Sequence, residues 1–281
     1  MHGKTCIVTG ASAGIGQAIA QGLAARGAHV VLVCRSRARA EATQHALHTA
    51  TGNPAIDVAL ADLSSQAEIR LLAQELLRRY PRIHALINNA GVVNTKRTVT
   101  VDGLEAVFAV NHLAYFLLTQ LLLPRLVESA PARIVNVASD AHHWVTLDFA
   151  DLQNHRRYRG LKVYGQSKLC NLLFTRELAR RIAGTGVTVN SLHPGGVATG
   201  LGWNNGWWVV LVATVLKPFL RTAAQGADTA IYLATAPEVA KVNGRYFYNR
   251  REHRPSRAAQ DDEAALRLWQ VCEQLTAPRR G

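Results

Sequence analysis

The sequence lacks the cysteine spacing of a metal-binding or disulfide-stabilised scaffold. Its 281 residues include four cysteines, which are widely separated and form no CxxC pair, so neither a zinc site nor a disulfide framework is expected. Cys6 and Cys34 lie in apolar runs typical of strands. We therefore predict reduced, mostly buried thiols in a cytosolic protein. The histidines show no ligand spacing either, and we predict no metal.

Long hydrophobic runs and a leader segment are also missing. The longest uninterrupted apolar run, within residues 207–216, is far shorter than the roughly 20 residues that a membrane-spanning helix needs. The first predicted strand begins at Thr5, which leaves no room for a signal peptide. We therefore expect a cytoplasmic protein without an anchor, folded as a single domain over residues 1–281.

Acidic residues are scarce relative to basic ones. The chain has 32 Lys and Arg against 19 Asp and Glu, a formal net charge of +13. A basic surface favours anionic partners, including cofactor phosphates and lipid head groups. No nucleic-acid-binding motif accompanies the charge, so no specific nucleic-acid partner is expected. A solvated basic face is the simplest interpretation.

Apolar strand-like runs alternate with longer helical patterns along the chain. Strands are predicted at 5–9, 29–33, 56–60, 85–88, 133–138, 187–192 and 244–248. Helices are predicted near 14–26, 37–51, 66–80, 103–128, 164–182, 224–235 and 263–275. This alternation predicts an α/β fold with a doubly wound parallel sheet of Rossmann type and helices on both faces. Its ligand crevice then lies at the carboxyl ends of the strands.

A glycine-rich turn follows the first predicted strand. Glycine permits a tight turn and close approach of backbone N–H groups to a pyrophosphate, and the next helix offers its N-terminus to the anion. Its position between a strand and a helix favours dinucleotide binding over a merely flexible turn. The residues expected to contact the cofactor here are Gly10, Ser12, Ala13, Gly14, Ile15 and Gly16.

No acidic residue ends the second predicted strand, where a carboxylate would bind a ribose 2′-OH and select NAD. Cys34 occupies that place and Arg35 follows it. Because a guanidinium matches the geometry of a phosphate, the sequence predicts NADP(H). Arg37 and Arg39, a little further on, are alternatively solvated charges on the next helix.

One tyrosine–lysine pair is spaced for acid–base chemistry. Tyr164 and Lys168 are four residues apart, so they share a helix face. Tyrosine titrates near pH 10 unaided, and a neighbouring ammonium favours the phenolate. The pair can therefore exchange a proton with a carbonyl or alcohol. Tyr158 and Lys162 have the same spacing, but Gly160 and the nearby arginines indicate an exposed loop, and we favour Tyr164.

Five ordered motifs resemble the short-chain dehydrogenase/reductase family over nearly the whole chain. They are the TGxxxGxG turn at 9–16, Asn88-Asn89-Ala90-Gly91, Asn111 with Ser139, Tyr164-x-x-x-Lys168, and Pro194-Gly195-Gly196-Val197-Ala198-Thr199. The resemblance implies that the catalytic residues are Asn111, Ser139, Tyr164 and Lys168. It implies that Ser139 binds the substrate oxygen, Lys168 holds the nicotinamide ribose and Asn111 supports a proton-relay water.

The same resemblance implies further cofactor contacts. They are Asp62, Leu63, Asn89, Ala90, Gly91, Pro194, Gly195, Val197 and Thr199. Asp62 would contact the adenine ring, although it could equally cap the helix that begins near Ser64. Pairing through the helices that contain Asn111 and Tyr164 is also implied, which gives a homodimer or homotetramer.

Within the family, segments 133–143, 167–181 and 192–195 resemble the retinol-dehydrogenase-like branch. This implies a hydrophobic carbonyl or alcohol substrate, such as a retinoid or another lipid aldehyde or ketone. Alternatives are a reductase of another bulky carbonyl (steroid, polyketide or xenobiotic) and an NADP(H)-sensing regulatory binding protein. Substrate contacts are expected from Ser139, His142, Trp203, Trp207 and Trp208.

Residues 195–222 interrupt the strand–helix rhythm and are predicted to form a substrate loop or lid. Three of the five tryptophans fall at 203–208, beside an apolar run. They either pack as plain core or form a partly exposed surface that contacts membranes and accepts lipid-like substrates. On the second interpretation, Trp207→Ala and Trp208→Ala raise KM for long-chain aldehydes much more than for short ones. Unchanged chain-length selectivity, without co-sedimentation with anionic vesicles, would favour plain core.

Overall fold

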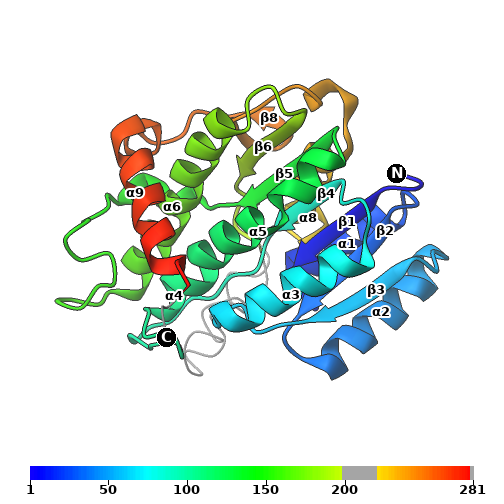
Figure 1. Ribbon diagram of the computed structural model, residues 1–281, viewed down its shortest axis with the longest axis horizontal. Coiled ribbons are helices and arrows are strands. Elements are labelled where there is room, and N and C mark those ends of the chain that lie inside the picture. The colour runs from blue at the N-terminus through cyan, green and yellow to red at the C-terminus, as the bar shows by residue number, and fades with distance from the viewer. Residues whose placement is uncertain (198–219, 279–281) are drawn as a thin grey trace.

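The computed structural model describes residues 1–197 and 220–278, and in this part of the chain it contains an eight-stranded sheet in the order β3-β2-β1-β4-β5-β6-β7-β8. The strands are β1 Thr5–Thr9, β2 His29–Cys34, β3 Ile56–Leu60, β4 Ala85–Asn88, β5 Ala132–Val137, β6 Val187–Leu192, β7 Tyr246–Tyr248 and β8 Arg251–Glu252. All neighbours pair in parallel except β7 and β8. The predicted Rossmann-type fold is confirmed (Figure 1).

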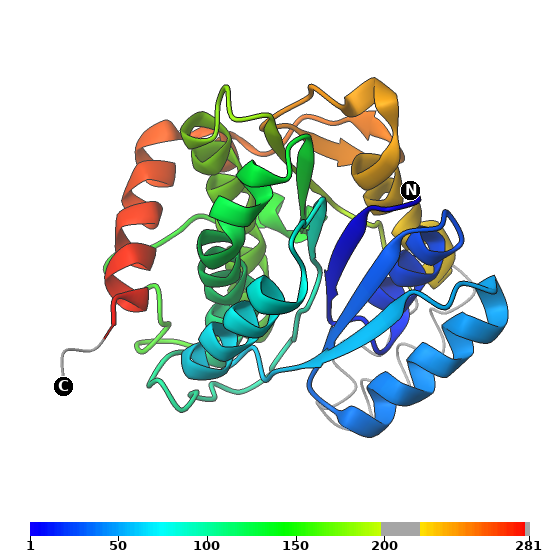
Figure 2. The same ribbon diagram turned by 45° about the vertical axis from the view of Figure 1, so that its right-hand side comes forward.

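Helices cover both faces of the sheet (Figure 2). One layer contains α3 Gln66–Arg79, α5 Ala114–Glu128 and α6 Gly160–Arg181, with α9 Asp262–Thr276 outside α6. The other contains α1 Gly14–Ala24, α2 Arg37–Thr51 and α8 Ala223–Thr235. Short elements are α4 Ala106–Phe108, η1 Ala109–Leu113, η2 Asp140–Trp144, η5 Pro237–Val239 and η6 Arg257–Gln260.

The central strands are apolar on both sides because each face packs against a helical layer. In β1, Ile7 faces the layer of α3, α5 and α6, whereas Cys6 and Val8 face α1 and α8. All four cysteines are free and buried, as predicted from their apolar surroundings.

The helix predicted at 103–128 is not one regular helix. Its first turn begins at Ala106, because the Glu105 carboxylate accepts hydrogen bonds from the N–H groups of Val107 (2.9 Å) and Phe108 (2.7 Å). A π-helical turn, η1, then separates α4 from α5 and contains Asn111. Such turns are common at functional sites, and this one places Asn111 near the carboxyl ends of the strands.

The same helical stretch is long and apolar enough, by length and composition, to cross a membrane. Ala106–Glu128 has a mean hydropathy of 1.7 over its most apolar window, of which 72% is buried inside the molecule. It packs against α3 and the sheet. Burial in the core accounts for this composition.

Helix α6 begins at Gly160 rather than at Tyr164. Lys162 therefore lies on its exposed first turn, and Tyr158 lies just before the helix, half-buried. The Tyr158 hydroxyl donates to the Glu105 carboxylate at 3.2 Å. In this second tyrosine–lysine pair, Tyr158 therefore makes a structural hydrogen bond while Lys162 is exposed to solvent.

Candidate active site

The glycine-rich turn brings the ends of β1 and β4 into close contact. Gly10 has a φ of +66°, and a Cβ atom there would lie 2.8 Å from Ala90 Cα. A Cβ on Gly16 would lie 2.3 Å from the Gly10 carbonyl oxygen. Any larger residue would force these segments apart, so glycine is required here by packing as well as by backbone conformation.

The start of α1 is suited to a dinucleotide phosphate. Its N-cap, Ala13, has no side chain that could accept a hydrogen bond, and no acidic residue lies in the first turn. The N–H groups at this helix end, from Gly14 onward, are left for an anion, and the helix dipole favours one. The residues present at this end of the crevice therefore fit a dinucleotide cofactor.

Thr9 and Asn89 hold the neighbouring loop in place. The Thr9 hydroxyl accepts hydrogen bonds from the N–H groups of Asn89 (2.9 Å) and Ala90 (3.1 Å), while Asn89 Nδ2 donates to the Thr9 carbonyl at 2.9 Å. The Tyr115 hydroxyl donates to the Ala90 carbonyl at 2.7 Å. The roles of Thr9 and Tyr115 were not predicted, because each bridges segments distant in sequence.

Arg35 and Asp62 lie together at the other end of the crevice. Their charged groups are 3.8 Å apart, and the Arg35 side chain is 76% exposed. An ion pair this exposed contributes at most about 1 kcal/mol, so Arg35 is free to bind another anion. Asp62 accepts a hydrogen bond from Ser64 N at 2.9 Å. It forms a turn before α3, whose N-cap is Ser65.

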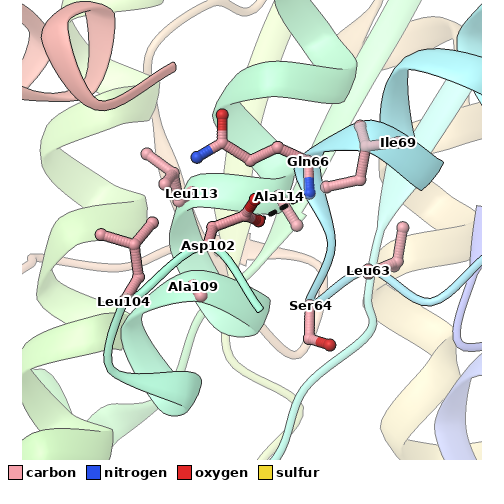
Figure 3. Close-up of a pocket in the computed structure, with 9 residues that line it drawn as sticks. All are labelled: Leu63, Ser64, Gln66, Ile69, Asp102, Leu104, Ala109, Leu113 and Ala114. Carbon is pink, nitrogen blue, oxygen red and sulfur yellow. Dashed lines mark hydrogen bonds between the residues drawn. The ribbon is translucent and has the colours of Figure 1, made fainter. Parts of the chain in front are cut away.

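A small cavity lies behind Leu63 (Figure 3). Its volume of about 10 Å³ is room for a single water at most. Figure 3 shows the Asp102 carboxylate at the cavity, accepting a hydrogen bond from Gln66 N at 2.8 Å. The cavity is thus part of the packing at the start of α3 and holds no substrate.

The Lys168 ammonium is buried beneath Tyr164. Lys168 is 3% exposed, its Nζ donates to the Val137 carbonyl at 3.0 Å, and it lies 5.6 Å from the Tyr164 ring centroid. Burial lowers the pKa of Lys168 to about 7. Helix α6 therefore brings the predicted pair together, with the lysine directed to the end of β5.

The pKa of Tyr164 is raised by burial, although a hydrogen bond with the Ser139 side chain acts in the opposite direction. The spacing of the pair predicted that the lysine would favour the phenolate. Burial instead sets the direction of the pKa shift, and Lys168, with a pKa lowered to about 7, is itself only partly charged at neutral pH. Tyr164 is therefore a protonated phenol here, suited to proton donation.

Ser139 ends the β5 segment as the N-cap of η2, with its hydroxyl accepting from Ala141 N at 3.3 Å. Asn111 is fully buried and bridges to the loop after β4: its Oδ1 accepts from Val92 N at 2.7 Å and its Nδ2 donates to Val92 O at 2.9 Å. Ser139, Tyr164 and Lys168 thus converge, and Asn111 adjoins them by donating from Nδ2 to Ser167 Oγ at 3.0 Å. Asn111 braces the adjoining loop.

The segment after β6 lies beside this group. Gly195 has a φ of +81°, and Arg221 bonds across the segment by donating to the carbonyls of Pro194 (3.2 Å) and Gly196 (2.8 Å). Val197 forms a parallel bridge with Arg221. Other predicted residues lie outside the described part of the chain: Thr199, Trp203, Trp207 and Trp208, with most of the predicted lid.

His142 does not have the place predicted for it. Its ring is fully buried, and both nitrogens are hydrogen-bonded, to Ser139 O (2.7 Å) and Ser256 N (3.1 Å). No ring nitrogen remains for a substrate, so direct polar contact is contradicted. Instead Trp144 (80% exposed) and Leu161 (81% exposed) present large apolar side chains on η2 and α6. Single exposed apolar residues are common, and no motif or spacing in the sequence distinguishes these two.

Among residues 1–197 and 220–278, no group of three or more His, Cys, Asp and Glu side chains could hold a metal ion. The crevice instead combines a phosphate-binding turn after β1 with Arg35 on one side and a tyrosine–lysine–serine group on the other. This arrangement defines a dinucleotide-dependent oxidoreductase site in which a side chain exchanges the proton.

Known proteins share this arrangement. Residues 4–208 match the short chain dehydrogenase family, and the chain belongs to that family. It is 43% identical to mouse retinol dehydrogenase 12 over 97% of this chain and 86% of that protein. A crystal structure of an uncharacterized Mycobacterium paratuberculosis protein superposes with a TM-score of 0.79 at 32% identity, covering 98% and 94% of the two chains. The Pseudomonas aeruginosa RhlG/NADP complex gives 0.70 at 30% identity, covering 88% and 94%.

Removing the Tyr164 hydroxyl tests the assignment of the proton donor. Tyr164→Phe keeps the ring and is expected to lower kcat by about 10²- to 10⁴-fold, with little change in melting temperature. Tyr158→Phe is the matched control, because it removes hydroxyl contacts to Glu105 and to the Asn94 carbonyl and is expected to cost stability while keeping turnover. Near-normal turnover in Tyr164→Phe together with loss in Tyr158→Phe would refute the assignment.

The buried lysine predicts a pH-dependent gain in stability. The pKa of Lys168 is lowered from 10.5 to about 7, so burial costs stability wherever the folded protein keeps the proton. Below pH 7 that cost is fully present, and it falls away between pH 7 and 10.5 as the folded state releases the proton.

Lys168→Met is therefore expected to raise the Tm at pH 6 by several degrees and to raise it much less near pH 10. Scanning calorimetry at both values, each against wild type at the same pH, measures this. Lys162→Met, on the exposed first turn of the same helix, is the control and should show no such trend. An equal change at both pH values would contradict a burial cost at Lys168.

Proposed function

We propose that the chain is an NADP(H)-dependent reductase of hydrophobic carbonyl compounds, retinoid-like or other lipid aldehydes and ketones. The observation that carries the proposal is the group formed by half-buried Tyr164 and Ser139 and the buried Lys168 in a dinucleotide-binding crevice. When bound, the nicotinamide supplies the hydride. The protein supplies the proton and the position of the carbonyl oxygen.

The protonation state of the site supports the reduction direction. Because the pKa of Tyr164 is raised, its phenol holds the proton at neutral pH and can give it to a carbonyl oxygen. The Ser139 side chain is close enough to the same phenol to lower its pKa, which supports a role for the Ser139 hydroxyl in binding that oxygen. Lys168, on α6, lies buried beneath Tyr164 and, by family resemblance, holds the nicotinamide ribose.

The preference for NADP(H) rests on the end of β2. Cys34 is buried there, and the exposed guanidinium of Arg35 follows it. No carboxylate of β2 is available to bind a ribose 2′-OH. The RhlG/NADP complex shows that a related protein at 30% identity binds NADP, which is consistent with this choice.

Relatives and exposed apolar residues support the hydrophobic substrate class. The retinol dehydrogenase named above is similar over almost the whole chain. Trp144 and Leu161 expose apolar surface on the two elements that carry Ser139 and Tyr164. Contact with a membrane surface through 195–222 and a cytoplasmic location stay predictions. A homodimer or homotetramer also stays a prediction, and α9 already covers part of α6 (Figure 1).

Cofactor titration and turnover test the proposal together. Purified protein is expected to bind NADPH more tightly than NADH and to oxidise NADPH when given retinal or long-chain aldehydes. Arg35→Ala should weaken the binding of NADPH by about 10- to 100-fold, which corresponds to the loss of hydrogen bonds to a charged group. It should weaken the binding of NADH much less. Arg37→Ala is the matched control, since Arg37 pairs with Glu41 on α2.

Equal affinity of the wild type for both cofactors would overturn the choice of NADP(H). Turnover restricted to small polar carbonyl compounds would contradict the proposed hydrophobic substrate class but not the proposed carbonyl reduction. Tight NADPH binding with no turnover of any carbonyl would instead favour a sensing role.

A further inference from the structure

His142 links the catalytic turn to a distant C-terminal segment. Its Nδ1 lies 2.7 Å from the carbonyl oxygen of Ser139, and its Nε2 lies 3.1 Å from the backbone nitrogen of Ser256, 114 residues further along the chain. The backbone N–H of His142 also donates to Ser139 O, at 3.3 Å. Two donors from one residue thus converge on the carbonyl of the serine that is placed to bind the substrate oxygen.

The two partners define the tautomer of the ring. A carbonyl oxygen only accepts, so Nδ1 carries the hydrogen; a backbone amide only donates, so Nε2 presents its lone pair. The ring is therefore neutral with both nitrogens used. Charged and titratable neighbours are His143, His253 and Asp140, and burial lowers the pKa of His142 to about 4. The neutral form persists at physiological pH.

The bonded segment also borders a ligand-sized hollow. The hollow has a volume of about 700 Å³, within the usual range of ligand pockets, and is lined by His143 from η2 and by residues of 254–261, including Ser256. His142 therefore stands between Ser139 and one wall of this space. Tyr246 packs edge-on against the other side of the ring, 5.1 Å between centroids, which leaves the ring one orientation.

We propose that His142 is a positioning residue for the reduction: it fixes the peptide after Ser139 and couples it to the wall formed by 254–257. The inference rests on the proposed function, in which the Ser139 hydroxyl binds the carbonyl oxygen. Ser139 has an extended backbone (φ −159°, ψ 152°), so rotation of its peptide would swing the hydroxyl away from Tyr164. The bond to Ser139 O opposes that rotation, and the bond to Ser256 N anchors the ring.

Two substitutions separate the two bonds. The amide nitrogen of Asn lies at the position of Nδ1, so His142→Asn can keep the bond to Ser139 and loses the bond to Ser256. The amide oxygen of Gln reaches the position of Nε2, so His142→Gln can keep the bond to Ser256 and loses the bond to Ser139. His84→Gln is the matched control, because His84 is a buried histidine whose Nδ1 accepts from Thr5 N at the amino end of β1, a bond that Gln loses.

Turnover and amide hydrogen exchange then give independent readouts. We expect His142→Gln to lower kcat by up to about 100-fold, the cost of misplacing a reacting group, with the KM for NADPH unchanged. His142→Asn should stay within a few-fold of wild type in kcat, while the Ser256 amide exchanges faster. The His84 control should lose stability at unchanged kcat.

Equal kcat losses in the two variants, in proportion to their losses of Tm, would overturn the positioning role. Unaltered exchange at Ser256 in His142→Asn would overturn the link to the C-terminal segment. Both results differ from failure of the proposed function, in which wild-type protein turns over no carbonyl while Ser256 exchange still responds to His142→Asn.

Discussion

The buried ammonium of Lys168 is the interaction on which the rest of the site depends. It replaces water with the Val137 carbonyl at 3.0 Å and with the faces of Tyr164 and Tyr115, 5.6 and 5.8 Å from the ring centroids. A lysine at this depth is costly, and its lowered pKa records that cost. The apolar packing of α6 against the sheet and α9 offsets it, so a largely buried helix carries the reactive pair.

The same burial sets the chemistry of the pair. Removing water disfavours the charged form of both groups, so the pKa of the lysine falls while that of the phenol rises. A site of this kind begins with a protonated phenol and a lysine that is only partly charged at neutral pH. Oxidation of an alcohol would need the phenolate, which the positive charge of an oxidised nicotinamide would favour. The raised pKa of the phenol thus favours proton donation, the step that the proposed reduction requires.

Local sequence patterns predicted most of the fold, together with the phosphate-binding turn and the tyrosine–lysine pair of the site. Apolar strand runs and the glycine-rich turn are recognised from residues that are neighbours in the sequence. The strands, the phosphate-binding turn and the pair of Tyr164 and Lys168 could therefore be predicted from the sequence. The π-helical turn at Asn111 could not, because one extra residue in a helix barely alters its periodicity. The two hydrogen bonds of the His142 ring could not be predicted from the sequence either, because one partner lies 114 residues away and tertiary packing brings the two residues together.

The C-terminal segment joins the catalytic layer at points that are far apart in sequence. Ser256 bonds to His142 behind Ser139, and at the start of α9 Asp262 pairs with Arg176 of α6 at 2.6 Å. Further along α9, Trp269 packs against Phe116 of α5, 5.0 Å between centroids. These contacts bind the last elements of the chain to the serine, to the helix of Tyr164 and to the helix that follows Asn111. Through the hydrogen bond from Ser256 to His142, the segment that begins at 254 is joined to the turn after β5 that carries Ser139.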